Sequence, residues 1–258
     1  MPPTPSADPV SPTLRTAPTT TPTPTTTPTP ATTPTPPTTP LTAPTPTPTR
    51  SQDPAPTPKP RTTLALGDQG PKVLQLQKRL NELGYWLGEP DGSFGSLTQQ
   101  AVWALQKSAG ISRDGVVGPR TMNALADGIR PPATLRGDGV EIDLARQVLL
   151  VVRGGAVRTV LNTSTGNGEE YISTRGNRAL ALTPKGRFTV YRGVDGPLTN
   201  SLGELWRPRF FDGGIAVHGS PSIPPWAASH GCARLSNAAI DMIWAKDLMP
   251  IGATVVVR

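Results

Sequence analysis

The chain has 258 residues, of which 33 are proline and only 35% are hydrophobic. Residues 1–60 hold 21 of those prolines, nine apolar residues and no glycine, so this stretch cannot bury enough apolar surface to fold, and one globular domain over the whole length is excluded. The net charge of +7 comes without a cluster of Lys and Arg, which argues against a nucleic-acid-binding arm and favours an anionic surface as partner.

Residues 1–60 alternate Thr and Pro, as in the run T-P-T-P-T-T-T-P-T-P at 21–30. Each proline fixes its own φ and restricts the residue before it to extended conformations. We therefore expect a disordered but stiff spacer, and the alternatives are a ligand for SH3 or WW domains or a glycosylated stalk. No stretch has the roughly 20 apolar residues of a transmembrane helix, and the first residues lack a signal-peptide pattern. If the protein is exported, its signal has been lost, lies upstream or is of another kind.

Residues 61–130 are expected to form a small all-α domain. A first helix is predicted after Pro71, a residue suited to a first helical turn, and a second after Ser96 as its N-cap. Apolar residues recur every three or four positions in both stretches, at Val73, Leu76, Leu80 and Leu83 and at Ala101, Val102, Leu105 and Ala109. This spacing gives each predicted helix one apolar face.

An internal repeat lies within these residues: D-G-S-F-G-S-L-T begins at Asp91 and D-G-V-V-G-P-R-T at Asp114. Turn and capping chemistry in a three-helix bundle explains such loops, whereas a calcium loop would need a final Glu that neither copy has. With V-L-Q-L-Q at 73–77 and L-G-Y at 83–85, the segment resembles a peptidoglycan-binding domain of the three-helix type. The resemblance implies peptidoglycan as a partner.

Residues 138–258 are expected to be mainly β. Apolar residues alternate from Val140 to Leu144, and an apolar run that ends at Val152 is followed by a glycine turn, which predicts a hairpin. Further strands are predicted at 187–192, 215–218 and 254–257, and one helix after Ser236 or Asn237. Many short strands with a single helix predict a β-sandwich or a barrel-like domain.

Cys232 is the only cysteine, and the only two histidines, His218 and His230, lie within 14 positions of it. An internal disulfide is therefore excluded. A buried structural thiol and a zinc site are alternatives, although no second pair of cysteines supports zinc. A thiol attacks as thiolate, and a nearby imidazole can accept its proton and stabilise the resulting charge, so the clustering favours a nucleophilic Cys232. Spacing leaves both histidines open as the base, and Gly231 would allow amide groups to form an oxyanion hole.

Four motifs resemble the L,D-transpeptidase catalytic domain of the YkuD type. They are S-H-G-C-A-R-L at 229–235, H-G at 218–219, T-P-K-G-R-F at 183–188, and I-D-L at 142–144 with Gln147. The resemblance implies Cys232 as nucleophile, His218 as base and the Gly219 carbonyl as the acceptor that orients the imidazole. It also implies that Ser229, His230 and Gly231 shape the pocket and the oxyanion hole, and that no metal or cofactor is required.

The implied substrate is a peptidoglycan tetrapeptide stem, outside the cytoplasm in the cell wall. Cys232 would form a thioester with release of D-Ala, and an amine would accept the acyl group to give a 3→3 cross-link. Water as acceptor would make the protein an L,D-carboxypeptidase, and carbapenems are expected to acylate the thiol. Arg234, which matches the family motif, and Arg207 and Trp226 are the predicted substrate contacts.

Two alternatives to this function remain. A Cys/His peptidoglycan hydrolase of the papain-like kind is disfavoured because such enzymes place Cys before His, whereas His218 precedes Cys232. A non-catalytic wall-binding protein is disfavoured because the Cys and His positions of the motif are intact.

Overall fold

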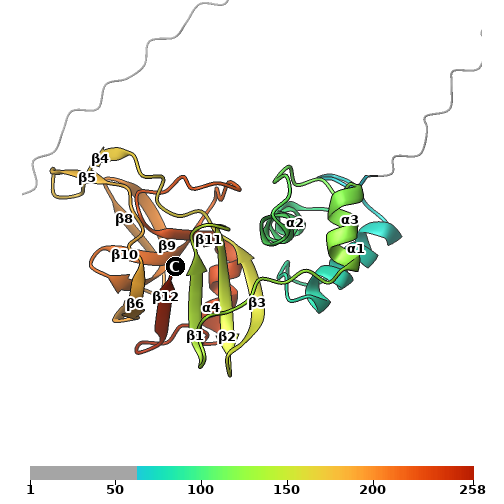
Figure 1. Ribbon diagram of the computed structural model, residues 1–258. Helices are drawn as coiled ribbons and strands as arrows, with labels where there is room; N and C mark the ends of the chain where they lie inside the picture. Colours follow the sequence, from blue (N-terminus) through green and yellow to red (C-terminus); the bar gives the residue numbers. More distant parts are fainter. Residues whose placement is uncertain (1–62) are drawn as a thin grey trace, which may run out of the picture. The chain divides into compact units, whose positions relative to one another are not determined.

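The computed structural model describes residues 63–258, so the predicted disorder of residues 1–60 lies outside the described residues. Three helices come first, α1 (Pro71–Glu82), α2 (Ser96–Ala109) and α3 (Pro119–Ala126). They are followed by β1 (Gly139–Asp143), β2 (Val148–Arg153), β3 (Ala156–Asn162), β4 (Glu170–Ile172), β5 (Arg178–Leu180), β6 (Gly186–Thr189), β7 (Arg192–Gly193), β8 (Pro197–Asn200), β9 (Gly203–Asp212), β10 (Ile215–Ser220), β11 (Ala233–Ser236), helix α4 (Asn237–Ala245) and β12 (Thr254–Val257). This order confirms the predicted fold class, a helical part followed by a mainly β part (Figure 1).

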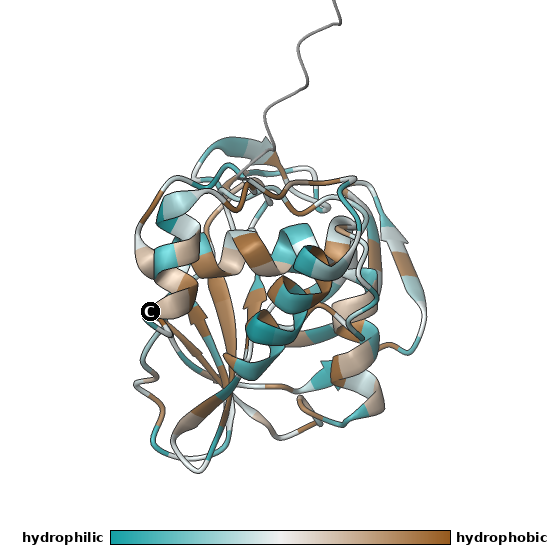
Figure 2. Ribbon diagram, turned by 90° about the vertical axis from the view of Figure 1, so that its right-hand side faces the viewer, coloured by the Kyte–Doolittle hydropathy of each residue, from teal (hydrophilic) through white to brown (hydrophobic). Residues whose placement is uncertain are grey.

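The first two helices form at the predicted places. Val73, Leu76 and Leu80 of α1 are at most 5% exposed, so the predicted apolar face is the buried one. In Figure 2, hydrophilic (teal) and hydrophobic (brown) residues are interspersed along the helices, as expected of amphipathic helices. The predicted N-cap of α2 is wrong by one residue, because Gly95 occupies that position in extended conformation and Ser96 is the first helical residue. None of the helices described here is long and apolar enough to cross a membrane.

Buried glutamines explain the internal repeat. Gln77 Nε2 donates to Asp91 Oδ1 at 2.8 Å, and Gln106 Nε2 donates to Asp114 Oδ1 at 2.7 Å. The same nitrogens also reach a loop carbonyl and a threonine hydroxyl in each copy. The Oε1 atom of Gln77 accepts the N–H of Gly92, as that of Gln106 accepts the N–H of the equivalent glycine. Gln77 thus binds the loop at Asp91 to α1, and Gln106 binds the loop at Asp114 to α2. The repeat therefore has a structural role in the bundle.

The β part consists of two five-stranded sheets and a separate hairpin of β4 and β5. The first sheet has the order β3-β2-β1-β12-β6, in which β1 and β12 are parallel. The second has the order β11-β10-β9-β7 with β8 paired to β9, and β10 and β11 are its parallel pair. Figure 1 shows β1, β2 and β3 side by side in one layer.

Strand β2 is buried on both faces, which explains its uninterrupted run of apolar residues. Leu149 and Val151 pack in the core between the two sheets, together with α4. Val148, Leu150 and Val152 alternate with them and pack in a second core, which they share with residues of α1, α2 and α3. The helices thus cover the outer face of the first sheet, and the helical and β parts share one apolar core.

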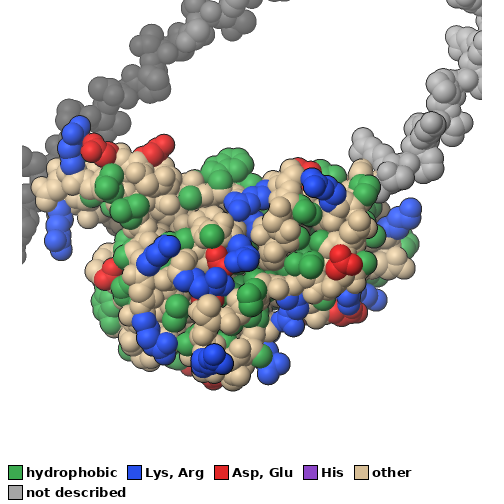
Figure 3. Space-filling model, viewed as in Figure 1, with side chains coloured by type: hydrophobic (Ala, Val, Ile, Leu, Met, Phe, Trp, Pro, Cys, Tyr) green, Lys and Arg blue, Asp and Glu red, His purple; other side chains and the backbone are tan. Residues whose placement is uncertain are grey.

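The described surface retains the basic balance of the sequence. On the face shown in Figure 3, Lys and Arg side chains are more frequent than Asp and Glu side chains. This distribution agrees with the net charge of +7 and with an anionic partner.

Candidate active site

Strands β10 and β11 place His218, Cys232 and Arg234 on one face of the second sheet. The two strands are parallel, and His218 pairs with Arg234 in their register. Side chains alternate along a strand, and Val217, Ala233 and Leu235 point into the core between the sheets. Their neighbours His218, Cys232 and Arg234 therefore point the other way, where all three line one cavity.

This cavity has a volume of about 810 Å³. Its walls come from the β4–β5 hairpin, the β8–β9 hairpin and the ends of β10 and β11. Besides the three residues named above, polar and aromatic side chains of the wall include Tyr171, Arg192, Asn200, Glu204, Phe210, Ser229 and His230. A space of this size is within the usual range for a small-molecule or peptide site.

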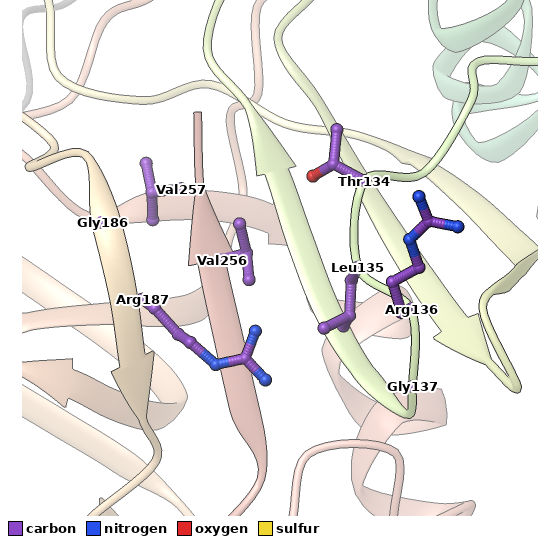
Figure 4. A pocket seen from close by; sticks show the side chains of 8 residues that line it. All are labelled: Thr134, Leu135, Arg136, Gly137, Gly186, Arg187, Val256 and Val257. Carbon is purple, nitrogen blue, oxygen red and sulfur yellow. The ribbon is translucent and has the colours of Figure 1, made fainter.

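A second hollow, of about 420 Å³, lies where the segment before β1 faces β6 and β12. Figure 4 shows the side chains of Arg136 and Arg187 at this place. Val256 and Val257 also line it, on strand β12, which lies between β1 and β6. No cysteine or histidine is among its lining residues. The chemistry predicted from the sequence therefore belongs to the larger cavity.

His218 is buried and held as a neutral imidazole. Its Nδ1 lies 2.8 Å from the carbonyl oxygen of Gly219, and because a carbonyl only accepts, Nδ1 carries the proton and Nε2 has the free lone pair. Burial lowers the pKa of His218 to about 4, and the charge of Arg234 acts in the same direction. Nε2 is therefore able to accept a proton at neutral pH.

Gly219 is required by close packing. A Cβ at this position would lie 2.7 Å from Asn237 Oδ1, 2.8 Å from Ile240 Cγ2 and 2.9 Å from Trp206 Cδ1. A side chain would therefore displace the carbonyl that orients the imidazole.

Cys232 is half-buried and lies beside β10 at the level of Ala216. The Ala216 N–H points at its Sγ over 3.4 Å, and Gly214 O lies 3.8 Å from Sγ. Burial raises the pKa of the Cys232 thiol, and the Ala216 N–H and the charge of Arg234 oppose this rise. The resting site therefore combines a neutral thiol with a neutral imidazole, and the thiolate has to form when a substrate is attacked.

The loop before Cys232 is fixed by two hydroxyl groups. Buried Ser229 donates from Oγ to Cys232 O at 2.6 Å and accepts the N–H of Gly231 at 3.0 Å. Thr183 Oγ1 donates to Gly231 O at 2.5 Å. Both the N–H and the carbonyl of Gly231 are thus bonded to hydroxyl groups in this structure.

His230 occupies a different part of the cavity wall from His218. It is exposed, and its ring contacts that of Tyr171 of β4, with 4.7 Å between the ring centroids and 37° between the ring planes. It therefore serves as wall for the cavity, while the oriented imidazole is that of His218.

Two of the three predicted substrate contacts lie elsewhere. Arg207 forms ion pairs with Asp195 at 2.8 Å and Asp241 at 3.0 Å and does not line the cavity. Trp226 is 62% exposed and also stands outside the lining. Residue type, on which both predictions depend, does not show where a side chain points. Arg234 is the predicted contact that lines the cavity.

The cavity wall also includes residues that the sequence motifs do not indicate. Tyr171, Asn200 and Glu204 line the cavity, but they lie on short hairpins without a clear sequence pattern. Thr183 belongs to the motif T-P-K-G-R-F, but its hydrogen bond to the carbonyl of Gly231 is visible only in the structure.

Comparisons with known proteins agree with this arrangement. The family model of an L,D-transpeptidase catalytic domain (YkuD) matches residues 137–257, and that of a peptidoglycan binding domain (PG_binding_1) matches residues 69–125. Part of the chain is similar to two N-acetylmuramoyl-L-alanine amidases. CwlL of Bacillus licheniformis is 51% identical over 67 residues, which are 25% of this chain and 19% of that protein. CwlM of Mycobacterium tuberculosis is 32% identical over 97 residues, which are 33% of this chain and 24% of that protein.

The chain thus spans only 19% and 24% of the amidases that it matches. A broader likeness is found with the crystal structure of the L,D-transpeptidase (residues 123–326) from Xylanimonas cellulosilytica DSM 15894. It is 49% identical with a TM-score of 0.75, and the match covers 78% of this chain and 100% of that one. On this identity over both parts of the described structure, the chain belongs to the L,D-transpeptidase family and carries a peptidoglycan binding domain.

Proposed function

We propose that the protein is a cysteine L,D-transpeptidase that acts on peptidoglycan tetrapeptide stems in the cell wall, outside the cytoplasm. The observation that carries the proposal is that Cys232 and an oriented His218 line the same cavity on one face of the second sheet. The family membership and the peptidoglycan binding domain support the same substrate class.

The first step is attack by the thiol. Sγ of Cys232 bonds to the carbonyl carbon of the third stem residue while the thiol proton moves to Nε2 of His218. The carbonyl oxygen becomes an oxyanion. We assign the N–H of Cys232 as a donor to it, since the N–H of Gly231 is bonded to Ser229 and preorganised donors stabilise such charge.

The second and third steps exchange the amine. The bond to the terminal D-Ala nitrogen breaks, His218 returns its proton to that nitrogen, and a thioester remains on Cys232. An amine of another stem then attacks the thioester, His218 takes a proton from this amine, and the Cys232 thiol is restored with that proton. Water in place of the amine yields the carboxylic acid instead.

Arg234 is positioned to serve both substrate and nucleophile. It lines the cavity one alternation after Cys232 on the same face of the sheet. Its charge opposes the rise in the pKa of the thiol, and a guanidinium also binds a carboxylate with two hydrogen bonds. It thus supports both thiolate formation and the binding of an anionic stem.

The test is incubation of tetrapeptide-stem muropeptides with the protein, followed by mass spectrometry for released D-Ala and for cross-linked dimer. A carbapenem added separately should increase the protein mass by one adduct at Cys232. His218→Ala should abolish both activities, while His230→Ala should leave adduct formation measurable. Full activity of Cys232→Ala would overturn the proposal. Release of D-Ala without dimer would identify an L,D-carboxypeptidase, and no reaction at all would leave a wall-binding protein.

A further inference from the structure

Side chains of the peptidoglycan binding domain form hydrogen bonds with the connection between β10 and β11. Residues 221–228 run from the end of β10, which carries His218, to Ser229, which fixes the loop of Cys232. Ile223 and Pro225 of this connection are buried. Their carbonyl oxygens need hydrogen-bond donors, because a buried carbonyl without one costs free energy.

Donors for these carbonyls come from α2 and the residues that follow it. Gln100 Nε2 of α2 donates to Ile223 O at 3.3 Å, and Arg113 Nη1 donates to Pro225 O at 3.0 Å. Asn162 of β3 donates to the same Ile223 oxygen and to Gln100 Oε1. Two side chains of the helical domain thus bind the backbone between the predicted base and the predicted nucleophile.

A third contact runs through Lys107, which is only 2% exposed. Its Nζ donates to Gln147 O at 2.8 Å and Thr163 O at 3.0 Å, and also to Asn162 Oδ1. Three acceptors require three N–H groups, which favours the ammonium form, although burial and Arg113 lower the pKa of Lys107 to about 6. This side chain fixes the start of the segment that follows β3.

The contact continues from Gln147 to Ser229. Gln147 donates from Nε2 to Thr165 Oγ1 at 2.7 Å and accepts the N–H of Thr165 at 2.9 Å. The carbonyl of Thr165 in turn accepts the N–H groups of Ala228 at 3.0 Å and Ser229 at 2.9 Å. A continuous set of hydrogen bonds therefore joins α2 to the residue that bonds to Cys232 O.

We infer that Gln100, Lys107 and Arg113 are positioning residues for the reaction at Cys232, and that the helical domain is part of the catalytic unit as well as a wall-binding module. The inference rests on the proposed function, because it concerns the reaction at Cys232. Apolar packing of the helices on β2 and β3 already joins the two parts. The polar contacts are different in kind, because they end on the connection that leads to the nucleophile.

The test uses the full chain with Gln100 and Arg113 both changed to Ala, since both side chains are only partly buried. The matched control is Arg120→Ala, which removes an exposed arginine of the same domain. Carbapenem acylation is followed by intact mass over a range of concentrations, and sedimentation with purified peptidoglycan measures wall binding. The free energy of unfolding, from urea titration, reports whether each variant is folded.

The double variant should acylate about 10- to 100-fold more slowly at saturating carbapenem, because small displacements of reacting groups have effects of this size. Its half-saturating concentration and its wall binding should equal those of Arg120→Ala. Arg113→Lys, which keeps one donor for Pro225 O, should recover part of the rate when it replaces Arg113→Ala. A double variant that is folded and acylates at the control rate overturns the inference.

A second readout keeps this test independent of the proposed function. Cys232 is the only cysteine of the chain, so its alkylation by iodoacetamide reports the loop without any substrate. If the unchanged protein neither forms an adduct nor releases D-Ala, the proposed function fails. The positioning inference is then decided by alkylation: a changed rate and pH profile in the double variant support it, and unchanged ones overturn it.

Discussion

Replacement of Gly231 by alanine tests whether the shape of the loop before Cys232 is imposed by close packing. Gly231 has a φ of 133°, and a Cβ there would lie 2.8 Å from both Ile215 Cδ1 and Leu182 O. Gly196 is the matched control, because its φ is 145° and nothing lies within 4 Å of an added Cβ. Both substitutions strain the backbone, but only Gly231→Ala also collides with a carbonyl.

The two effects have separable magnitudes. A non-glycine residue held in such a conformation costs about 1–3 kcal/mol, and this loss is expected in both variants. Overpacking adds about 1–3 kcal/mol in a well-packed interior, and this loss is expected for Gly231→Ala alone. The free energy of unfolding should therefore fall by about 1–3 kcal/mol for Gly196→Ala and by about 2–6 kcal/mol for Gly231→Ala.

Urea unfolding and carbapenem acylation measure the two consequences. Gly231→Ala should also lose acylation rate when compared at equal folded fraction, because displacement of Gly231 moves the Thr183 and Ser229 contacts that hold the nucleophile. Gly196→Ala should acylate normally once folded. Equal losses of stability in the two variants, or normal acylation by folded Gly231→Ala, would refute the close-packing argument.

Three further predictions concern the base, the repeat and the cavity wall. Because the pKa of His218 is lowered to about 4 and only the neutral imidazole accepts a proton, the acylation rate should fall as the pH drops through about 4; a fall centred near the ordinary value of about 6.5 contradicts this. Gln77→Ala and Gln106→Ala should each lower the free energy of unfolding by about 1–3 kcal/mol in urea titration, since each leaves buried groups unpaired; a loss in only one denies that the copies are equivalent. Trp226→Ala should leave the KM for muropeptides unchanged, because this exposed side chain lies outside the cavity lining; a raised KM would show that Trp226 contacts the substrate.

Much of the architecture follows from local pattern. The apolar spacing of α1, the alternation that begins at Val140 and the Ser236 cap of α4 are properties of single segments. These elements form as expected because the regularly spaced apolar residues are the ones that become buried. Cys232 and His218 stand out because cysteine and histidine are scarce in the chain, and the structure places both in one cavity.

The remaining features depend on contacts that a linear pattern does not contain. Strand β9 includes Pro208, and Arg207 has a φ of 48°, so neither propensity nor alternation indicates a strand of this length. The same strand turns Arg207 away from the cavity towards two aspartates, a choice set by tertiary charge pairing. Gln106 reads as an ordinary helical residue, and its function is visible only when the loop beyond it folds back.

The parallel pairing of β10 and β11 explains why the helical domain reaches the catalytic loop. Parallel neighbours require a crossover connection, which in most proteins is a helix that satisfies its own backbone groups. Here residues 221–232 cross without a helix, and their carbonyls therefore need donors from elsewhere. Ser164 supplies one to Trp226 O at 2.8 Å and Asn162 of β3 one to Ile223 O, while Gln100 and Arg113 of the helical domain donate to Ile223 O and Pro225 O. The same connection ends at Ser229 and Cys232. The side chains of the helical domain that bind its backbone therefore also help to place the nucleophile.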